Sequence, residues 1–134
     1  MPQFRLSEAA SLLGVSDDTV RRWVRAGQLA AGTDSAGRKV VEGADLAVFA
    51  REQARKLEDP SGIGRSARNR FVGLVTEVTA DKVMAQVELQ CGAHRVVSLM
   101  STEAVRELGL RPGVLAVAVV KATQVVVETP GGDK

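Results

Sequence analysis

The chain has 134 residues, enough for one ordinary domain or two very small ones and too few for a large enzyme. Hydrophobic residues make up 45% and charged residues 25%, close to globular averages, which excludes a disordered or fibrous chain. Aromatic residues make up only 3%, which argues against base stacking on aromatic rings as a main binding mechanism. The net charge of +2 is too small to indicate nucleic acid as a partner by bulk electrostatics.

Several other classes of protein find no support in the sequence. The longest apolar run, residues 115–120, is far shorter than the roughly 20 residues of a membrane span, and the first residues lack the pattern of a signal peptide. One cysteine cannot form a disulfide within the chain, and one cysteine with one histidine cannot supply a tetrahedral zinc site. We therefore expect a soluble cytoplasmic protein with no membrane partner and no metal cation as cofactor.

The spacing of apolar residues changes once along the chain. Up to residue 57 they recur at intervals of three and four, as in helices, whereas from residue 71 they alternate in valine-rich runs, as in strands. The intervening residues 58–65, EDPSGIGR, contain one proline and two glycines and indicate a linker. The sequence therefore predicts an α+β protein of two small domains, residues 1–57 and residues 66–130.

The first domain begins with two short helices separated by a tight turn. Ser7 is a suitable N-cap of the first helix, Gly14 ends it, and Ser16 caps the second helix, which ends at Gly27. Apolar residues three and four positions apart form the buried face of the second helix: Val20, Trp23 and Val24. The opposite face presents polar and cationic residues together: Thr19, Arg21, Arg22 and Arg25. This layout is typical of a DNA-recognition helix.

A hairpin and a third helix complete the first domain. Residues 30–41 predict a two-stranded wing whose tip is residues 34–37, with Arg38 and Lys39 beside the tip, and residues 44–57 predict an amphipathic helix. About residues 4–52, and LSEAASLLGVSDDTVRRWVRAGQL (6–29) in particular, resemble the helix-turn-helix of the excisionase and MerR-type winged-helix families. The resemblance implies that the second helix enters the major groove of double-stranded DNA while the wing contacts the backbone. It assigns to DNA Thr19, Arg21, Arg22, Arg25, Arg38 and Lys39. In the alternative interpretation, the arginines form a solvated helix face.

The second domain consists mainly of predicted strands. Five runs alternate or are apolar throughout, at residues 71–78, 82–90, 94–100, 114–120 and 123–128. A short helix at residues 101–108 separates the third run from the fourth. This pattern predicts a five-stranded, OB-like β-barrel with one short helix.

Three segments of this domain share one resemblance. RSARN (65–69), SLMSTEAVRELGL (98–110) and VVKAT (119–123) are similar to the Mop, or TOBE, domain, which binds molybdate and tungstate. The resemblance covers residues 65–128. It implies sites at subunit interfaces, built from the Ser-Ala-Arg-Asn turn of one chain and from the Lys-Ala segment and the serine before the short helix of a neighbour. The implied oxyanion-binding residues are Ser66, Ala67, Arg68, Asn69, Ser101, Lys121 and Ala122.

The chemistry of these residue types suits a tetrahedral dianion that accepts hydrogen bonds and donates none. Arg68 and Lys121 supply positive charge, and the remaining residues supply hydroxyl, amide and backbone N–H donors. Ala104 stands where the related molybdate regulator commonly has a second serine, so one hydroxyl donor is missing unless Thr102 replaces it; Thr123 is a further candidate donor. In the alternative interpretation these residues are surface ion-pair partners, a turn and a helix cap.

Together the two domains predict a molybdate- or tungstate-responsive, DNA-binding transcriptional regulator. The sequence contains no Ser-His-acid set and no phosphate loop, so we do not expect an enzyme. Because each chain has one barrel and the implied site needs two chains, we expect a homo-oligomer, either a dimer or a trimer of dimers. Two alternatives remain open: a molybdate storage or buffering protein, and an architectural, excisionase-like DNA binder that its barrel oligomerises.

Overall fold

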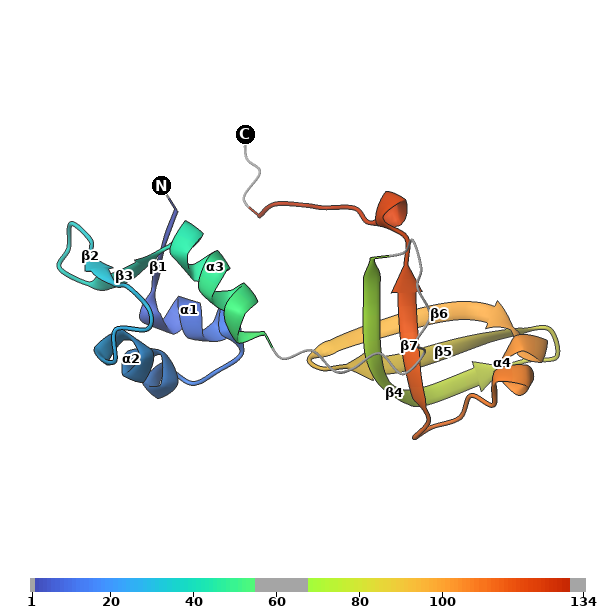
Figure 1. Cartoon of the computed structure of the whole chain (residues 1–134). Helices are drawn as coiled ribbons and strands as arrows, with labels where there is room; N and C mark the ends of the chain where they lie inside the picture. The colour runs from blue at the N-terminus through green and yellow to red at the C-terminus, as the bar shows by residue number, and fades with distance from the viewer. Residues whose placement is uncertain (1, 55–67, 131–134) are drawn as a thin grey trace. The chain divides into compact units, whose positions relative to one another are not determined.

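A computed structural model describes residues 2–54 and 68–130 of the chain. The chain mixes helices with antiparallel sheets and divides into two compact units, Met1–Lys56 and Leu57–Lys134 (Figure 1). None of the helices in the described ranges has the length and apolar character needed to cross a membrane.

The N-terminal unit packs three helices against a small sheet. Its elements are β1 (Gln3–Arg5), α1 (Leu6–Leu13), α2 (Asp17–Arg25), β2 (Gly32–Thr33), β3 (Lys39–Glu42) and α3 (Gly43–Gln53). Within residues 2–54 the sheet has three antiparallel strands in the order β1-β3-β2. Each helix contributes to the buried core: Leu6, Ala9, Ala10, Val20, Leu29, Val41, Leu46 and Phe49.

The helix boundaries follow local chemistry, with one correction. Gly14 adopts φ 71°, a left-handed conformation that glycine tolerates at a helix end, and the Ser16 hydroxyl caps α2 as predicted. Ser7 is not the N-cap of α1, because the helix already begins at Leu6, where the Glu8 carboxylate accepts a hydrogen bond from the Arg5 N–H at 2.8 Å. This bond satisfies one of the free donors of the first turn, so the helix needs no serine cap.

Trp23 lies in the core of this unit, as its position on the apolar face of α2 predicts. It is half-buried and packs against the core cluster. Its ring contacts Phe49 of α3 in an edge-to-face arrangement, with centroids 5.0 Å apart. With Trp23 on the core side, the arginines of α2 are left on the solvent side.

The C-terminal unit is a curled antiparallel sheet with one helix. Its elements are β4 (Asn69–Ala80), β5 (Met84–Cys91), β6 (His94–Ser101), α4 (Thr102–Leu108), β7 (Leu115–Val120) and the 3-10 turn η1 (Ala122–Gln124). Within residues 68–130 the strand order is β6-β5-β4-β7. The register of β4 shifts between Val75 and Glu77, and Figure 1 shows β4 bent, one part alongside β7 and the other alongside β5. This bend positions β7 and the residues that follow it.

The predicted fifth strand, residues 123–128, is not part of this sheet. The chain forms η1 over Ala122–Gln124 and then continues without strand pairing, with Val126 and Val127 more than 80% exposed. The run of three valines favours a strand, but a strand also needs a partner edge, and the described part of the chain pairs this segment with none. Within residues 68–130, the structure therefore has a four-stranded curled sheet in place of the five-stranded barrel expected from the sequence.

Candidate functional site

Two cationic side chains line one pocket beside the start of β4 and the end of β7. Asn69, the first residue of β4, pairs with Val120, the last residue of β7. Arg68 directly precedes this pair and Lys121 directly follows it, so antiparallel pairing brings the two cations together. They share an open pocket of about 300 Å³. The residues that line it are Arg68, Lys121, Ala122 and Thr123. Three of the predicted oxyanion residues, Arg68, Lys121 and Ala122, thus lie together.

The pocket is chemically suited to an anion. Both cations are exposed, and none of the four lining residues carries a carboxylate. Because two like charges in one pocket repel each other, a bound anion lowers their electrostatic energy. Backbone donors are also available: the first hydrogen bond of η1 runs from the Gln124 N–H to the Lys121 carbonyl, so the N–H groups of Ala122 and Thr123 precede the bonded part of the turn.

Thr123 is a site residue that the sequence indicated only weakly. It lines the pocket beside Lys121 because η1 turns the chain immediately after β7. Its hydroxyl adds a donor to the backbone N–H groups. Asn69 has a different position: its side-chain N–H donates to the Val120 carbonyl at 3.2 Å, so this residue joins β4 to β7 beside the pocket. Ser66 and Ala67 lie outside the described residues.

Ser101 lies at the opposite end of the sheet from Arg68 and Lys121. Ser101 pairs with Met84 of β5, and the neighbouring Ala85 pairs with Ala80, the last residue of β4. Arg68, in contrast, directly precedes Asn69, the first residue of β4. The twelve residues of β4 therefore separate Ser101 from the pocket within one chain. The family resemblance implied a different grouping, with Ser101 and Lys121 from one chain and Arg68 from another.

The residues around Ser101 have structural partners. The Ser101 hydroxyl caps α4 by accepting the Ala104 N–H at 3.0 Å, and its own O–H remains able to donate. Thr102 is buried, and its hydroxyl donates to the Asp81 carbonyl at 2.9 Å, which fastens α4 to the β4–β5 turn. Thr102 is therefore not the replacement donor that the missing serine at Ala104 required.

Helix α2 presents a cationic face to solvent. Arg21, Arg22 and Arg25 are all exposed. Arg21 lies 3.8 Å from an Asp18 carboxylate that is itself 95% exposed, and an ion pair of this kind contributes little. Thr19 is half-buried, and its hydroxyl lies 2.9 Å from the Ser16 hydroxyl, so it takes part in capping the helix.

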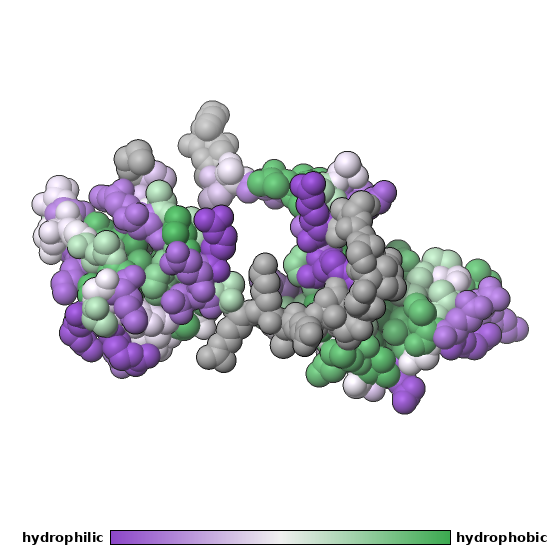
Figure 2. Space-filling view, viewed as in Figure 1, coloured by the Kyte–Doolittle hydropathy of each residue, from purple (hydrophilic) through white to green (hydrophobic). Residues whose placement is uncertain are grey.

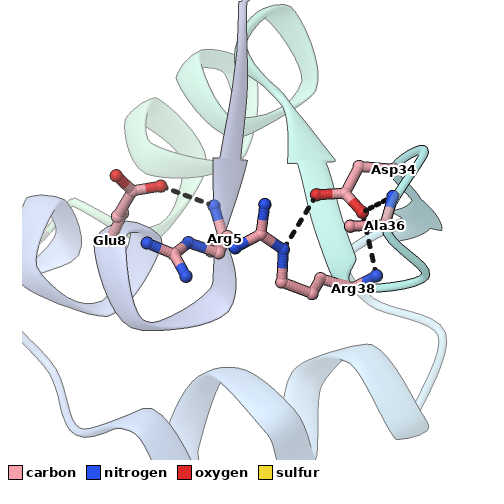
Figure 3. A network of polar contacts seen from close by, with 5 residues as sticks. All are labelled: Arg5, Glu8, Asp34, Ala36 and Arg38. Atoms are coloured by element: carbon pink, nitrogen blue, oxygen red, sulfur yellow. Dashed lines mark hydrogen bonds and ion pairs between the residues drawn. The ribbon is translucent and has the colours of Figure 1, made fainter.

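The β2–β3 hairpin holds its two cations differently. Asp34 closes the turn: one carboxylate oxygen accepts the Ala36 and Arg38 N–H groups, both at 2.9 Å, and the other accepts the Arg38 Nε–H at 3.3 Å (Figure 3). The backbone hydrogen bond from Arg38 is the main cause that lowers the pKa of Asp34 below 3.8. Lys39 is exposed beside the turn. The Arg38 guanidinium thus keeps its terminal N–H groups for a further partner.

Within residues 2–54 and 68–130, the structure shows no cluster of three or more histidine, cysteine, aspartate or glutamate side chains that could hold a metal ion.

Comparisons with known proteins agree with the division of the chain into two units. Residues 65–127 match the model of the TOBE domain family, and residues 4–54 match that of a helix-turn-helix domain. The chain is 38% identical over 63 residues to molybdenum-pterin-binding protein 2 of Clostridium pasteurianum, which covers 46% of this chain and 93% of that protein. It is 38% identical over 65 residues to the molybdenum transport protein ModE of Herbaspirillum seropedicae, covering 48% of this chain but only 24% of ModE.

Two solved structures are similar to about half of the chain. MopII from Clostridium pasteurianum is 36% identical, covers 49% of this chain with all of its own, and superposes with a TM-score of 0.46. The cytoplasmic molybdate-binding protein ModG, in a form with molybdate bound, is 43% identical, with 48% of this chain matching 46% of that one and a TM-score of 0.45. The chain belongs to the TOBE domain family through residues 65–127, and it carries a helix-turn-helix domain at residues 4–54.

Proposed function

We propose that this protein is a cytoplasmic transcriptional regulator that binds double-stranded DNA in response to molybdate or tungstate. The observation that carries the proposal is the presence, in one chain, of a helix-turn-helix domain with an exposed arginine face and a TOBE domain with the Arg68–Lys121 pocket. In this assignment residues 1–57 bind DNA, residues 58–65 link the domains, and residues 66–130 bind the oxyanion.

The proposed ligand follows from the relatives and from the pocket. The matched relatives are named for molybdenum or molybdate, and the pocket offers two cations with neutral N–H and O–H donors. Charge-assisted hydrogen bonds from Arg68 and Lys121 would contribute more binding free energy to a dianion than to a neutral ligand. Sulfate has the same charge and shape as molybdate, so we infer that discrimination against it comes from the size of the completed cavity.

We further propose that two chains complete each oxyanion site. Ser101 lies too far along the sheet to join Arg68 and Lys121 of its own chain, so a second copy is the source of any serine from this position. The protein would then work as a dimer or as a trimer of dimers.

Apolar surface on the C-terminal unit supports association of this kind. The curled sheet leaves an apolar groove of about 450 Å³, whose lining includes Val75, Val87, Leu89, Val96 and Met100. Hydrophobic residues are prominent on the surface in Figure 2, and the exposed ones include Leu99, Leu115, Val126 and Val127. A second copy is the occupant we propose, because its own segment 125–128 contains three consecutive valines, which favour a strand, and β6 and β7 are the edge strands of the sheet within residues 68–130.

For the DNA-binding half, we propose that α2 enters the major groove. A helix fits this groove, and guanidinium groups bind guanine edges and phosphates in pairs of hydrogen bonds. Arg21, Arg22 and Arg25 are the proposed contacts on α2, with Thr19 at its start and Arg38 and Lys39 on the hairpin.

The proposal is tested by selecting duplexes from a random library with the purified protein and measuring affinity by fluorescence anisotropy. We expect salt-dependent binding that changes at least about fivefold when molybdate is added and does not change with sulfate, since typical allosteric couplings are about 1–3 kcal/mol. Replacing Arg21, Arg22 and Arg25 together by alanine should abolish selective binding in a variant still folded by circular dichroism. If the protein binds molybdate but no DNA, the result favours a molybdate storage protein. If it binds DNA with an affinity that molybdate does not change, the result favours an architectural DNA binder.

A further inference from the structure

Strand β1 brings an arginine that the sequence did not single out onto the same face of the N-terminal sheet as Arg38. Arg5 pairs with Val40 of β3, and Phe4 pairs with Val41. Paired residues on neighbouring strands point to the same face, and successive residues alternate between faces. Phe4 and Val41 belong to the core, so Arg5 and Val40 point to the opposite, outer face. Arg38 directly precedes β3, and its carbonyl accepts the Asp34 N–H at 2.8 Å, which continues the pairing of the hairpin by one residue; two residues before Val40, Arg38 points to this face as well (Figure 3).

The outer face carries arginine side chains over an apolar strand residue. Val40 is only 5% exposed although it is outside the core cluster, so side chains on the outer face cover it. Arg5 lies opposite Val40 on this face, and Arg38 and Glu42 lie two residues before and after it; Glu42 accepts a hydrogen bond from Gln3, and in Figure 3 the Arg38 side chain extends toward Arg5. Apolar stems that cover a valine leave the guanidinium groups at the surface.

Neighbouring carboxylates accept hydrogen bonds from the backbone of both arginines, and Asp34 also forms an ion pair with the Arg38 side chain. Glu8 accepts the backbone N–H of Arg5, and Asp34 accepts the backbone N–H and the Nε–H of Arg38 (Figure 3). A guanidinium has five N–H donors, so the terminal groups of Arg38 and the side chain of Arg5 remain for another acceptor. Two guanidinium groups on one face match a phosphodiester, whose two free oxygens accept hydrogen bonds and carry one negative charge.

We propose that Arg5 and Arg38 together bind a backbone phosphate of DNA, with Arg5 a contact residue in its own right. The inference rests on the proposed DNA-binding function and adds a second contact region to α2. Residues 26–31 alone connect α2 to the hairpin, and Figure 1 shows the hairpin and α2 at the same side of the N-terminal unit. A helix in the major groove and a phosphate contact beside it would fix the register of the protein on the duplex.

The test measures DNA affinity as a function of salt for the full chain and for Arg5→Gln, Arg5→Ala and Arg38→Ala. Glutamine keeps most of the stem over Val40 and removes the charge, and both Arg5 variants keep the backbone N–H that Glu8 accepts. The control is Arg51→Ala, which removes an exposed arginine from the last turn of α3. Melting temperature and circular dichroism verify that each variant is folded.

Each Arg5 and Arg38 variant should bind the selected duplex roughly 5- to 10-fold more weakly at 0.1 M salt, and the slope of log K against log salt should fall by about 1. Arg51→Ala should change neither. The inference is overturned if folded Arg5→Gln keeps the salt slope of the parent while DNA binding still depends on Arg21, Arg22 and Arg25. This result leaves the proposed function standing. A full chain that binds no duplex overturns the proposed function itself.

Discussion

At the scale of single residues, the candidate oxyanion site depends on one strand register. Asn69 opposite Val120 places Arg68 and Lys121 in one pocket. A charge-assisted hydrogen bond contributes roughly 1.5–3 kcal/mol, so Arg68→Ala and Lys121→Ala should each weaken molybdate binding by about 10- to 100-fold. Equilibrium dialysis with molybdenum analysis measures the loss. Arg111→Ala, an exposed cation at the other end of β7, is the matched control and should bind as the parent does. Equal losses in all three variants would contradict a localised site.

Asp34 makes a second residue-scale prediction, on pH. Its pKa is lowered in the folded protein, chiefly by the backbone hydrogen bond from Arg38, so the turn is stabilised above the ordinary value of 3.8 and loses this stabilisation as the pH falls through the lower, folded pKa. NMR titration should therefore show the Ala36 and Arg38 amide resonances shifting together with a midpoint below 3.8. Asp34→Asn should abolish that transition. A midpoint at or above 3.8 would show that these hydrogen bonds do not form in solution.

Which residues the sequence could identify depended on the kind of information each one needed. Arg68 and Lys121 stand in short motifs that a resemblance can align, and the structure brings them together. Arg5 carries no motif, because its position on the outer face follows from pairing between a three-residue strand and β3. Thr102 was considered a candidate anion donor, but its hydroxyl bond to the Asp81 carbonyl joins residues 21 positions apart, which no local pattern reveals.

At the scale of elements, the close approach of β4 and β5 makes a stability prediction. A Cβ on Gly73 would lie 2.4 Å from the Gln90 carbonyl oxygen and 2.7 Å from the Cys91 sulfur, and the first of these is rigid backbone. Gly73→Ala should therefore lower the free energy of unfolding of the C-terminal unit by about 1–3 kcal/mol. Urea unfolding followed by circular dichroism measures it. Gly32→Ala, where a Cβ meets nothing within 4 Å, should stay within about 0.5 kcal/mol of the parent.

The elements also show what periodicity can and cannot predict. The helical spacing gave α2 and α3, and the alternation gave β4 to β7 in the correct order, because burial on one face of an element is a local property of the sequence. Strand β1 was missed because three residues are too few to alternate. The valine run in segment 123–128 predicts a strand, but pairing depends on a partner edge, which no local pattern encodes, and this prediction is wrong.

At the scale of the whole molecule, we expect the unpaired valines to lie in an interface between copies. Val126→Asp puts a charge into that interface, so light scattering should show the parent at the mass of two chains or more and the variant at a lower mass. The control is Leu12→Asp in the N-terminal unit, which replaces another exposed apolar side chain, 64% exposed, and should leave the mass unchanged. A parent with the mass of one chain at micromolar concentration in the presence of molybdate would contradict the shared site.

The proposed regulation requires anion occupancy in one domain to alter DNA binding in the other. With an oxyanion shared between subunits, the ligand would favour one arrangement of paired helix-turn-helix domains over others, and paired domains match operators with two half-sites. The differential affinity of the ligand for those arrangements sets the size of the response.

The central claim is that the chain binds a tetrahedral oxyanion of molybdenum or tungsten, and calorimetric titration of the full chain tests it most directly. Molybdate, tungstate and sulfate are titrated separately into the same preparation at pH 7. We expect saturable heats for molybdate or tungstate with a dissociation constant at least about tenfold below that of sulfate, equivalent to about 1.4 kcal/mol. Flat titrations with all three anions, or equal affinity for sulfate, would contradict the account.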